Sequence, residues 1–309
     1  MIYLRLMGGM GNQMFQFAMA RALCHRTGAE LTIDASLMAD NESVNSQGIS
    51  LRTYALDVFG LEADLCEKQF GKKILFTRKQ DRVKRFGATF FCKATNLFSD
   101  RWIAGIVERK KVGFDKSLLK LPRNVFLQGY FPSYRYFEDC QKLIRDEFSF
   151  RSKPDASNQQ LMDFMASTNS VSLHVRRGDY ISNQNTNDKF GVCSLGYYKK
   201  AIDYIEEKIE NPRYFIFTND LDYARENMEV DKSAVFVSGN TGHKSFEDMR
   251  LMSHCKHNII ANSSFSWWAA WLNNNPHKIV IAPSPVFDKL DIKDKDFFPA
   301  EWIKLPKYG

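Results

Sequence analysis

The second half of the sequence alternates between short apolar segments and longer amphipathic segments, and this alternation constrains the fold more than any other feature. Short apolar runs bounded by polar residues indicate strands, whereas apolar residues spaced three or four positions apart indicate helices. The expected strands are 171–175, 214–218, 234–237, 258–261 and 278–282, and the expected helices are 195–210, 221–228, 246–255 and 265–274. Repeated strand–helix units predict a parallel sheet covered by helices on both faces.

The first half begins with a unit of the same kind and then becomes harder to interpret. Its expected elements are strands at 2–6, 30–34 and 124–130 and helices at 12–26 and 134–148, with none assigned between 35 and 120. The 309 residues suffice for two domains of ordinary size. The polar segment 152–158, which contains Pro154, is the best linker candidate. We therefore expect an α/β protein with one domain at 1–152 and another at 153–309.

Composition narrows the class of protein. Hydrophobic residues make up 44% of the chain and charged residues 26%, which is typical of globular proteins. No apolar run approaches the roughly 18 residues of a membrane span, and the N-terminus lacks the features of a secretory signal. The six cysteines are scattered without a C-x-x-C pair. That pattern favours reduced thiols over a disulfide framework or a zinc site, so we expect a cytoplasmic protein without a transmembrane segment.

The net charge of +7 attracts anions without saying which ones. Much of the excess lies in KKILFTRKQDRVKR at 72–85. Its ordinary interpretation is a solvated basic face, and peripheral contact with a membrane surface is a second one. No signature of a nucleic-acid-binding module accompanies it, so we expect no nucleic-acid partner.

Ligands on parallel sheets bind beyond the carboxyl ends of the strands, which makes the residues after each expected strand candidates for a site. The strand that contains His174 is followed by Arg176, Arg177 and Asp179. Guanidinium groups present a planar fork that matches phosphate oxygens, so the pair predicts a phosphate clamp. Because neighbouring strand side chains point oppositely, we expect one arginine to face the ligand and Asp179 to hold the other. The alternative is a purely internal ion pair between Arg177 and Asp179.

Another strand end carries Asn219 and Asp220, which are typical of a helix N-cap. A phosphate bound at the same helix start is the other interpretation. Asp220 and Asp222 have the spacing of a D-x-D metal clamp, but both fit ordinary capping and first-turn positions. We therefore expect no metal site.

A third strand end leads into Asn262, Ser263, Ser264 and Phe265 at the start of an expected helix. Hydroxyl groups and unpaired backbone N–H groups at a helix start suit a bound anion. The tryptophans that follow are more typical of core packing than of ligand contacts. They are Trp267, Trp268 and Trp271.

The N-terminal glycines allow a different interpretation. Gly9 and Gly11 follow a strand and Asp34 ends the next strand, in the outline of an NAD-binding fingerprint. However, Met14 occupies the third glycine position, and the fingerprint leaves the arginine pair without a function. An NAD-dependent oxidoreductase is therefore the weaker alternative.

Four segments together carry a resemblance to a known family. They are GGMGNQMFQFAMARAL at 8–23, HVRRGDY at 174–180, FIFTND at 215–220 and NSSFSWWAAWL at 262–272. In this order they closely resemble the alpha-1,2-fucosyltransferases of glycosyltransferase family 11, with the middle of the first half least covered. The resemblance implies a GT-B-type architecture, in which two Rossmann-like domains face each other across a cleft. It places the acceptor side in the N-terminal domain and GDP-fucose in the C-terminal domain.

The resemblance also implies a reaction and its partners. L-Fucose would pass with inversion from GDP-fucose to the 2-hydroxyl of a terminal β-galactose, without a metal or other cofactor. Lactose, N-acetyllactosamine, a lacto-N-biose unit or a lipid-linked O-antigen repeat would all fit as the β-galactoside acceptor. A nucleotide-sugar-binding protein without turnover is a further alternative.

The same resemblance assigns site residues. Arg176 would bind the diphosphate, His174 would lie near the guanine or its ribose, and Asp248 would read the guanine through its ring N–H and amino group. Ser263 and Ser264 would contact phosphate oxygens. The remaining donor-binding candidates are Arg177, Asn219, Asn262, Phe265 and, from the N-terminal domain, Gly9, Gly11 and Asn12.

Two further points concern the facing domain and the base. Asn12, together with the turn at Gly9 and Gly11, matches a signature that faces the cleft from the N-terminal domain. Related fucosyltransferases have a glutamate beyond the arginine motif that is proposed to act as the catalytic base. The corresponding segment here, ISNQN at 181–185, contains no acidic residue. Asp179 is the nearest carboxylate, and a phosphate oxygen of the departing GDP is the other candidate, so the base stays open.

Overall fold

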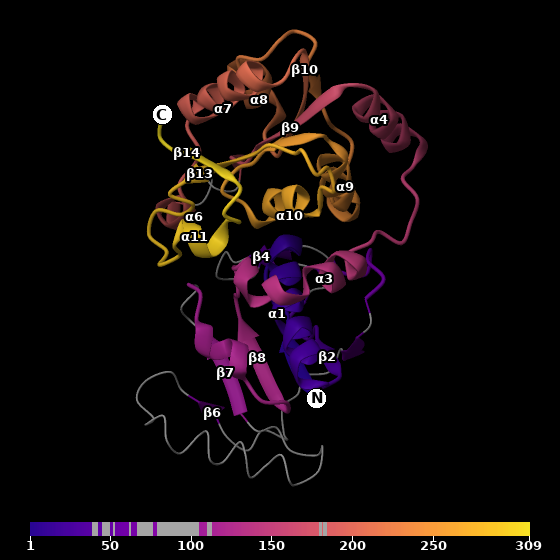
Figure 1. Cartoon of the computed structure of the whole chain (residues 1–309), viewed down its shortest axis with the longest axis vertical. Coiled ribbons are helices and arrows are strands. Elements are labelled where there is room, and N and C mark those ends of the chain that lie inside the picture. Colours follow the sequence, from indigo (N-terminus) through magenta and orange to yellow (C-terminus); the bar gives the residue numbers. More distant parts are fainter. Residues whose placement is uncertain are drawn as a thin grey trace. The chain divides into compact units, whose positions relative to one another are not determined.

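The computed structural model describes residues 1–38, 43–44, 50–51, 53–61, 63–66, 77–78, 105–109, 113–178, 181 and 184–309. Its chain divides into two compact units, Met1–Arg151 and Ser152–Gly309. Each unit is built on a six-stranded sheet (Figure 1). Within the described ranges, no helix is both long enough and apolar enough to cross a membrane. Most of the basic segment 72–85 lies outside these ranges.

The sheet of the first unit has the strand order β5-β2-β1-β8-β7-β6, and every pairing in it is parallel. Its strands are β1 (Ile2–Arg5), β2 (Leu31–Asp34), β5 (Asp64–Cys66), β6 (Thr77–Arg78), β7 (Gly105–Arg109) and β8 (Val125–Gly129). A separate antiparallel pair consists of β3 (Ser43–Val44) and β4 (Ser50–Leu51). The helical elements are α1 (Met10–Thr27), η1 (Lys116–Lys120), η2 (Tyr134–Tyr136), η3 (Glu138–Cys140) and α3 (Gln141–Glu147).

Helix α1 is buried over most of its surface, because its sequence is apolar on nearly every side. The buried apolar side chains include Met14, Phe15, Phe17, Met19 and Leu23. The helix ends at Gly28, which adopts a left-handed φ of 66° and donates its N–H to the Cys24 carbonyl at 2.8 Å. Glycine suits this position since other residues are strained there.

The expected helix at 134–148 is broken into η2, η3 and α3. The Ser133 hydroxyl caps η2 by accepting the Arg135 N–H at 3.3 Å. Phe137, between the two short helices, has a φ of −133°, which is not helical. This turn buries both Tyr136 and Phe137 completely. Tertiary burial of the two rings therefore interrupts a segment whose sequence is compatible with one helix.

The sheet of the second unit has the order β11-β10-β9-β12-β13-β14, again with parallel pairings throughout. Its strands are β9 (Asn169–Val175), β10 (Pro212–Thr218), β11 (Val235–Phe236), β12 (His257–Ile259), β13 (Val280–Ser284) and β14 (Ile303–Pro306). The helical elements are α4 (Ala156–Ser167), α6 (Gln184–Phe190), α7 (Leu195–Lys208), α8 (Leu221–Asn227), η4 (Gly242–Lys244), α9 (Phe246–His254), α10 (Ser264–Leu272) and α11 (Asp294–Phe297). Numbered along the unit, the strands lie in the Rossmann order 3-2-1-4-5-6.

Strand β9 lies inside the sheet and is buried along nearly its whole length, as expected of a parallel strand covered on both faces. It pairs with β10 on one side and with β12 on the other. The order of the strands reverses here, so the carboxyl ends of β9 and β12 lie side by side at the topological switch point. Ligands of Rossmann-like sheets bind at this position.

All five strands and four helices expected in the second half are present, with ends shifted by a few residues. The elements that were not expected are β14, α4, α6, η4 and α11. Strand β14 alternates between exposed and partly buried residues at the sheet edge and has a weak apolar signal. Helix α4 begins within the expected linker, because the Asp155 carboxylate caps it by accepting the Asn158 N–H at 3.0 Å.

The tryptophan-rich helix α10 supplies part of the core, as predicted. Trp267, Trp268 and Trp271 are almost completely buried, and the indole of Trp267 donates to the Phe297 carbonyl at 2.9 Å. The ring centroids of Trp267 and Trp302 are 5.4 Å apart. These tryptophans therefore pack against one another and against the C-terminal part of the unit.

Candidate functional site

The end of strand β9 presents a buried histidine beside an arginine. His174 and Arg176 are two positions apart and so point to the same face of the sheet. The Tyr198 hydroxyl donates to the His174 carbonyl at 3.1 Å, which fixes the strand end. Burial, with a smaller contribution from the Arg176 charge, lowers the pKa of His174 to about 3. The imidazole is therefore neutral at physiological pH.

The imidazole also has an unsatisfied atom. Within the described residues, His174 Nδ1 is buried and has no hydrogen-bond partner. The ring centroid of Phe265, at the start of α10, lies 6.2 Å from that of His174. Buried polar atoms are normally paired, so an unpaired one at a switch point is a candidate for a ligand contact.

Arg177 is held by α8 and its cap. Its Nε lies 3.6 Å from Asp220 Oδ2, and its guanidinium carbon lies 3.7 Å from the centre of the Tyr223 ring. The prediction that only one of the two arginines faces a ligand stays a prediction. The partner of Arg177 is Asp220, whereas Asp179, which we expected to hold this arginine, lies outside the described residues. The role of Asp179 as a base stays a prediction.

Asn219 shapes the loop that carries the arginines. Its Oδ1 accepts the N–H groups of Arg177 at 3.0 Å and Gly178 at 3.2 Å. A Cβ added to Gly178 would lie 2.9 Å from Asn219 Nδ2 and 3.2 Å from the Asn219 backbone oxygen, so a larger residue would have to displace the Asn219 side chain. The cap of α8 is Asp220, whose Oδ1 accepts the Tyr223 N–H at 3.4 Å. The side chain of Asn219, expected on the donor side, therefore acts within the protein as a loop anchor.

The start of α10 lies beyond the neighbouring strand β12. Ser263 is the N-cap residue, and its hydroxyl accepts the Phe265 N–H at 3.3 Å. Ser264 and Phe265 are partly exposed in the first turn. Because α10 has nine residues and begins beside the end of β9, its N-terminal dipole and backbone N–H groups favour an anion here.

Asn262 has a different environment from the serines. Its side chain is completely buried and donates to the carbonyls of Phe190 and Gly191, both at 2.8 Å. The Cys193 thiol approaches its Oδ1 at 3.5 Å. Both amide hydrogens are therefore used inside the protein. Asn262 fixes the loop after α6, a function that its place in the serine motif did not indicate.

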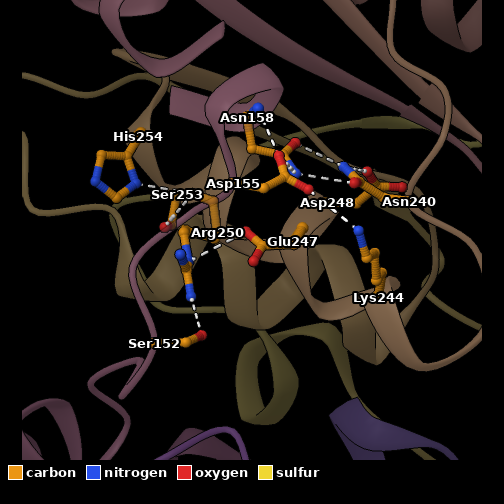
Figure 2. Close-up of polar contacts among 10 residues, drawn as sticks. All are labelled: Ser152, Asp155, Asn158, Asn240, Lys244, Glu247, Asp248, Arg250, Ser253 and His254. Atoms are coloured by element: carbon orange, nitrogen blue, oxygen red, sulfur yellow. Dashed lines mark hydrogen bonds and ion pairs between the residues drawn. The ribbon is translucent and has the colours of Figure 1, made fainter. Parts of the chain in front are cut away.

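Asp248 lies in the first turn of α9 (Figure 2). Helices of strand–helix units begin at the edge where the strands end, so Asp248 shares an edge with the ends of β9 and β12. Burial is the main cause that raises the pKa of Asp248 to about 6; a hydrogen bond from Asn240, at 2.9 Å, opposes it, and the charge of Glu247 adds to it. A perturbed carboxyl at this edge is a candidate for binding chemistry.

A buried ion pair stabilises the same turn of α9. Glu247 Oε2 lies 3.3 Å from Arg250 Nε, and Arg250 Nη2 donates to the Ser152 hydroxyl at 3.2 Å (Figure 2). Burial raises the pKa of Glu247. The pair ties α9 to the first residue of the unit, because Ser152 begins it.

In the first unit, the turn after β1 is held by two glutamines that the sequence reading missed. Gln13 Nε2 donates to the Gly8 carbonyl at 2.8 Å, and Gln16 bonds the Met7 N–H at 3.0 Å and the Met7 carbonyl at 2.9 Å. Both side chains are completely buried. Their only signal in the sequence is that they follow the glycines.

The glycines of this turn differ in conformation and in structural role. Gly8 has a left-handed φ of 77°, and a Cβ there would lie 3.0 Å from Asn12 Nδ2. Gly9 is the N-cap of α1 with an extended conformation, so the helix begins at Met10, earlier than expected. Gly11 is buried and Asn12 is partly buried in the first turn.

The alternative NAD interpretation does not fit this turn. Asp34, the acid that would bind a ribose, is completely buried. Its Oδ2 accepts from Arg5 Nε at 2.8 Å and its Oδ1 accepts the Ser36 N–H at 2.9 Å. Because the Asp34 carboxylate is buried and already bonded to Arg5 and Ser36, it is not available to accept hydrogen bonds from two ribose hydroxyls. In addition, the residues covered by the structure contain no group of three or more histidine, cysteine or acidic side chains that could hold a metal ion.

Two Rossmann-like units, with an arginine and a helix start at the switch point of the second, define a GT-B-type glycosyltransferase. Comparison with known proteins agrees with this class. The chain belongs to glycosyl transferase family 11, whose model matches residues 1–306. The predicted family, fold class and enzyme class are therefore confirmed.

Two relatives that match this chain over nearly their whole length support the same family assignment. The chain is 32% identical to the alpha-1,2-colitosyltransferase of Escherichia coli over 98% of each chain. It is 31% identical to the O-antigen biosynthesis glycosyltransferase WbnK of Escherichia coli, over 93% of this chain and 95% of the relative. Among solved structures, the alpha-1,6-fucosyltransferase NodZ soaked with GDP-fucose shares the fold, with a TM-score of 0.51 at 15% identity, over 88% of this chain and 91% of NodZ.

Proposed function

We propose that the chain is an inverting alpha-1,2-fucosyltransferase that moves L-fucose from GDP-fucose to the 2-hydroxyl of a terminal β-galactose. The observation that carries the proposal is the arrangement at one edge of the second sheet. Arg176, the neutral His174 and the start of α10 lie at the switch point, with Asp248 at the same edge. Family 11 membership and the names of the relatives support the reaction class.

Each group matches one part of the donor. Arg176 directs its positive charge toward the diphosphate, and the backbone N–H groups and hydroxyls of Ser263 and Ser264 donate to the diphosphate oxygens at the start of α10. The carboxylate of Asp248 accepts the guanine ring N–H and amino group. Because His174 is neutral, it can form a hydrogen bond with a hydroxyl group of GDP-fucose without adding charge to the site.

The chemical step follows from this arrangement. The acceptor hydroxyl oxygen bonds to C1 of fucose from the face opposite GDP while the bond from C1 to the diphosphate oxygen breaks. Negative charge grows on the departing GDP, where Arg176 and the α10 start stabilise it through preorganised dipoles and charge. The hydroxyl proton passes to Asp179 or to a phosphate oxygen of GDP. No metal ion is required, because fixed protein groups meet the charge of the leaving group.

The first unit would contribute the acceptor side. The turn after β1 carries the donor-binding candidates Gly9, Gly11 and Asn12, and it lies at the carboxyl end of β1, which is the switch point of that sheet between β1 and β8. The acceptor proposed is a β-galactoside in an oligosaccharide or an O-antigen-type repeat, with or without a lipid carrier.

One assay tests the proposal. The protein is incubated with GDP-fucose and lactose in EDTA, and both GDP and a fucosylated trisaccharide are measured. Linkage analysis of the product then distinguishes the 2-hydroxyl from other positions. Tight binding of GDP-fucose without product would instead indicate a binding protein, and binding of NAD would indicate an oxidoreductase.

The colitosyltransferase relative favours a second candidate for the donor sugar. The base-reading and diphosphate contacts proposed here are common to GDP-fucose and GDP-colitose, because both donors carry GDP. The same assay is therefore run with both sugars in parallel. Product from GDP-colitose alone would retain the site assignments but change the transferred sugar.

A further inference from the structure

A line of four polar side chains runs from Asp248 to the start of α4 (Figure 2). Asn240 Nδ2 donates to Asp248 Oδ1 at 2.9 Å and to Asn158 Oδ1 at 3.0 Å. Asn158 Nδ2 donates in turn to Asn240 Oδ1 and to Asp155 Oδ1, both at 3.0 Å. The two amides are thus paired reciprocally between two carboxylates.

This pairing determines the orientation of both amides. Each amide nitrogen has two hydrogens, and each has two acceptors within reach. Turning either amide over would place its oxygen against a carboxylate oxygen and lose both donations. Asn158 is 3% exposed, so water does not readily replace its bonds. The orientation of Asn240 is therefore determined from the far side by Asn158, and Asn240 in turn holds one oxygen of Asp248.

A carboxylate that reads guanine must keep both oxygens in the plane of the base. The terminal torsion of an aspartate is broad, so an unanchored carboxylate samples many planes. We propose that Asn240 is a positioning residue that holds the carboxylate of Asp248 in the orientation needed to accept two N–H donors from guanine. The inference rests on the proposed function, in which Asp248 reads the base.

The charges around Asp248 come from three elements. Glu247 precedes it on α9, Asp155 lies at the start of α4, and Lys244 on η4 is 3.3 Å from Asp155 Oδ2. Helix α10, which also packs on α9, has no charged residue between Ser264 and Leu272. Burial and Glu247 raise the pKa of Asp248, whereas the bond from Asn240 lowers it. Loss of that bond should therefore move the pKa further upward.

The test compares GDP with inosine diphosphate, which lacks the exocyclic amino group but has the same phosphates. Calorimetry gives both affinities for the full chain and for Asn240→Leu, which removes the donor at similar volume. The GDP preference should fall about threefold to tenfold, as for loss of a positioned hydrogen bond. The midpoint at which the preference declines with falling pH should also move to higher pH. Lys244→Gln is the matched control, because it alters the same cluster without touching Asp248.

A second variant covers the case in which Asn240→Leu does not fold. Asn240→Asp keeps the shape but replaces the donor by a carboxylate, so the pH midpoint should rise at least as far as in the leucine variant. Wild-type preference and midpoint in a folded Asn240 variant would overturn the positioning role, provided that Asp248→Asn loses the preference. If Asp248→Asn itself keeps the preference for GDP, the proposed base reading fails instead.

Discussion

Changing Asn262→Ala should destabilise the second unit without altering direct contacts to the donor. The substitution leaves the Gly191 carbonyl without the donor that it has in the structure, while the Phe190 carbonyl keeps a bond from Lys307 Nζ at 2.9 Å. An unsatisfied buried polar group costs about 1–3 kcal/mol, and the lost bond to Phe190 adds about 1 kcal/mol. We therefore expect the free energy of unfolding to fall by about 2–4 kcal/mol.

The assay is thermal unfolding by calorimetry, with and without GDP. For a unit of this size the loss corresponds to a fall in Tm of roughly 5–15 °C. Stabilisation by GDP depends on the ratio of its concentration to its Kd, so at one saturating concentration it should raise the stability of wild type and variant equally if the affinity is unchanged. Asn274→Ala is the control, because Asn274 is exposed two positions beyond the end of α10. Unchanged stability combined with a reduced GDP effect would refute the reasoning and return Asn262 to the donor side.

Three further predictions concern the proposed site. Between pH 7 and pH 5 the preference for GDP over ADP should fall about tenfold, because the Asp248 carboxyl, with a pKa of about 6, loses most of its charge in this range. Asp248→Asn should make the pH profile of this preference flat. A flat profile in the wild-type protein would contradict the prediction. His174, with a pKa of about 3, stays neutral in this range, and the shared phosphates cancel in the ratio. Arg176→Ala should lower turnover roughly 100-fold or more with the fold retained, as judged by steady-state rates and circular dichroism; near-normal turnover would exclude it from the diphosphate site. Activity should persist in millimolar EDTA and Asp222→Ala should be mild, whereas complete loss restored only by manganese would overturn the metal-free mechanism.

The second sheet could be predicted because its strands are buried and separated by long amphipathic helices. Strand β9 shows this most clearly, since six of its seven residues are buried. The strands of the first unit are harder to recognise. Strands β5 and β6 have three and two residues, and segments of that length carry no measurable period. Prediction from pattern therefore succeeded for strands set in regular strand–helix units, such as β9, and failed for β5 and β6, which are short and lack such a setting.

The site divides in a similar way. The positions of His174, Arg176 and Ser263 near strand ends could be predicted from the expected strands, and their roles stay predictions. The partners could not, because they come from distant parts of the chain. Asn219 bonds the loop of Arg177 across 42 positions, and Asn158 bonds Asn240 across 82. Asparagine and glutamine side chains have no periodic signal, so only the folded contacts show that they orient the groups around them.

The clustering of tryptophan in one half of the chain has a practical consequence for spectroscopy. Four of the five tryptophans, including the buried group around Trp267, belong to the unit Ser152–Gly309, and Trp102 is the fifth. Intrinsic fluorescence excited at the indole band therefore reports mainly on the second unit, whereas far-ultraviolet dichroism reports on the helices and strands of both. If the two units unfold independently, the two signals will trace separate denaturation curves. If GDP binds the second unit as proposed, it will move the fluorescence curve and only the part of the dichroism curve that comes from that unit.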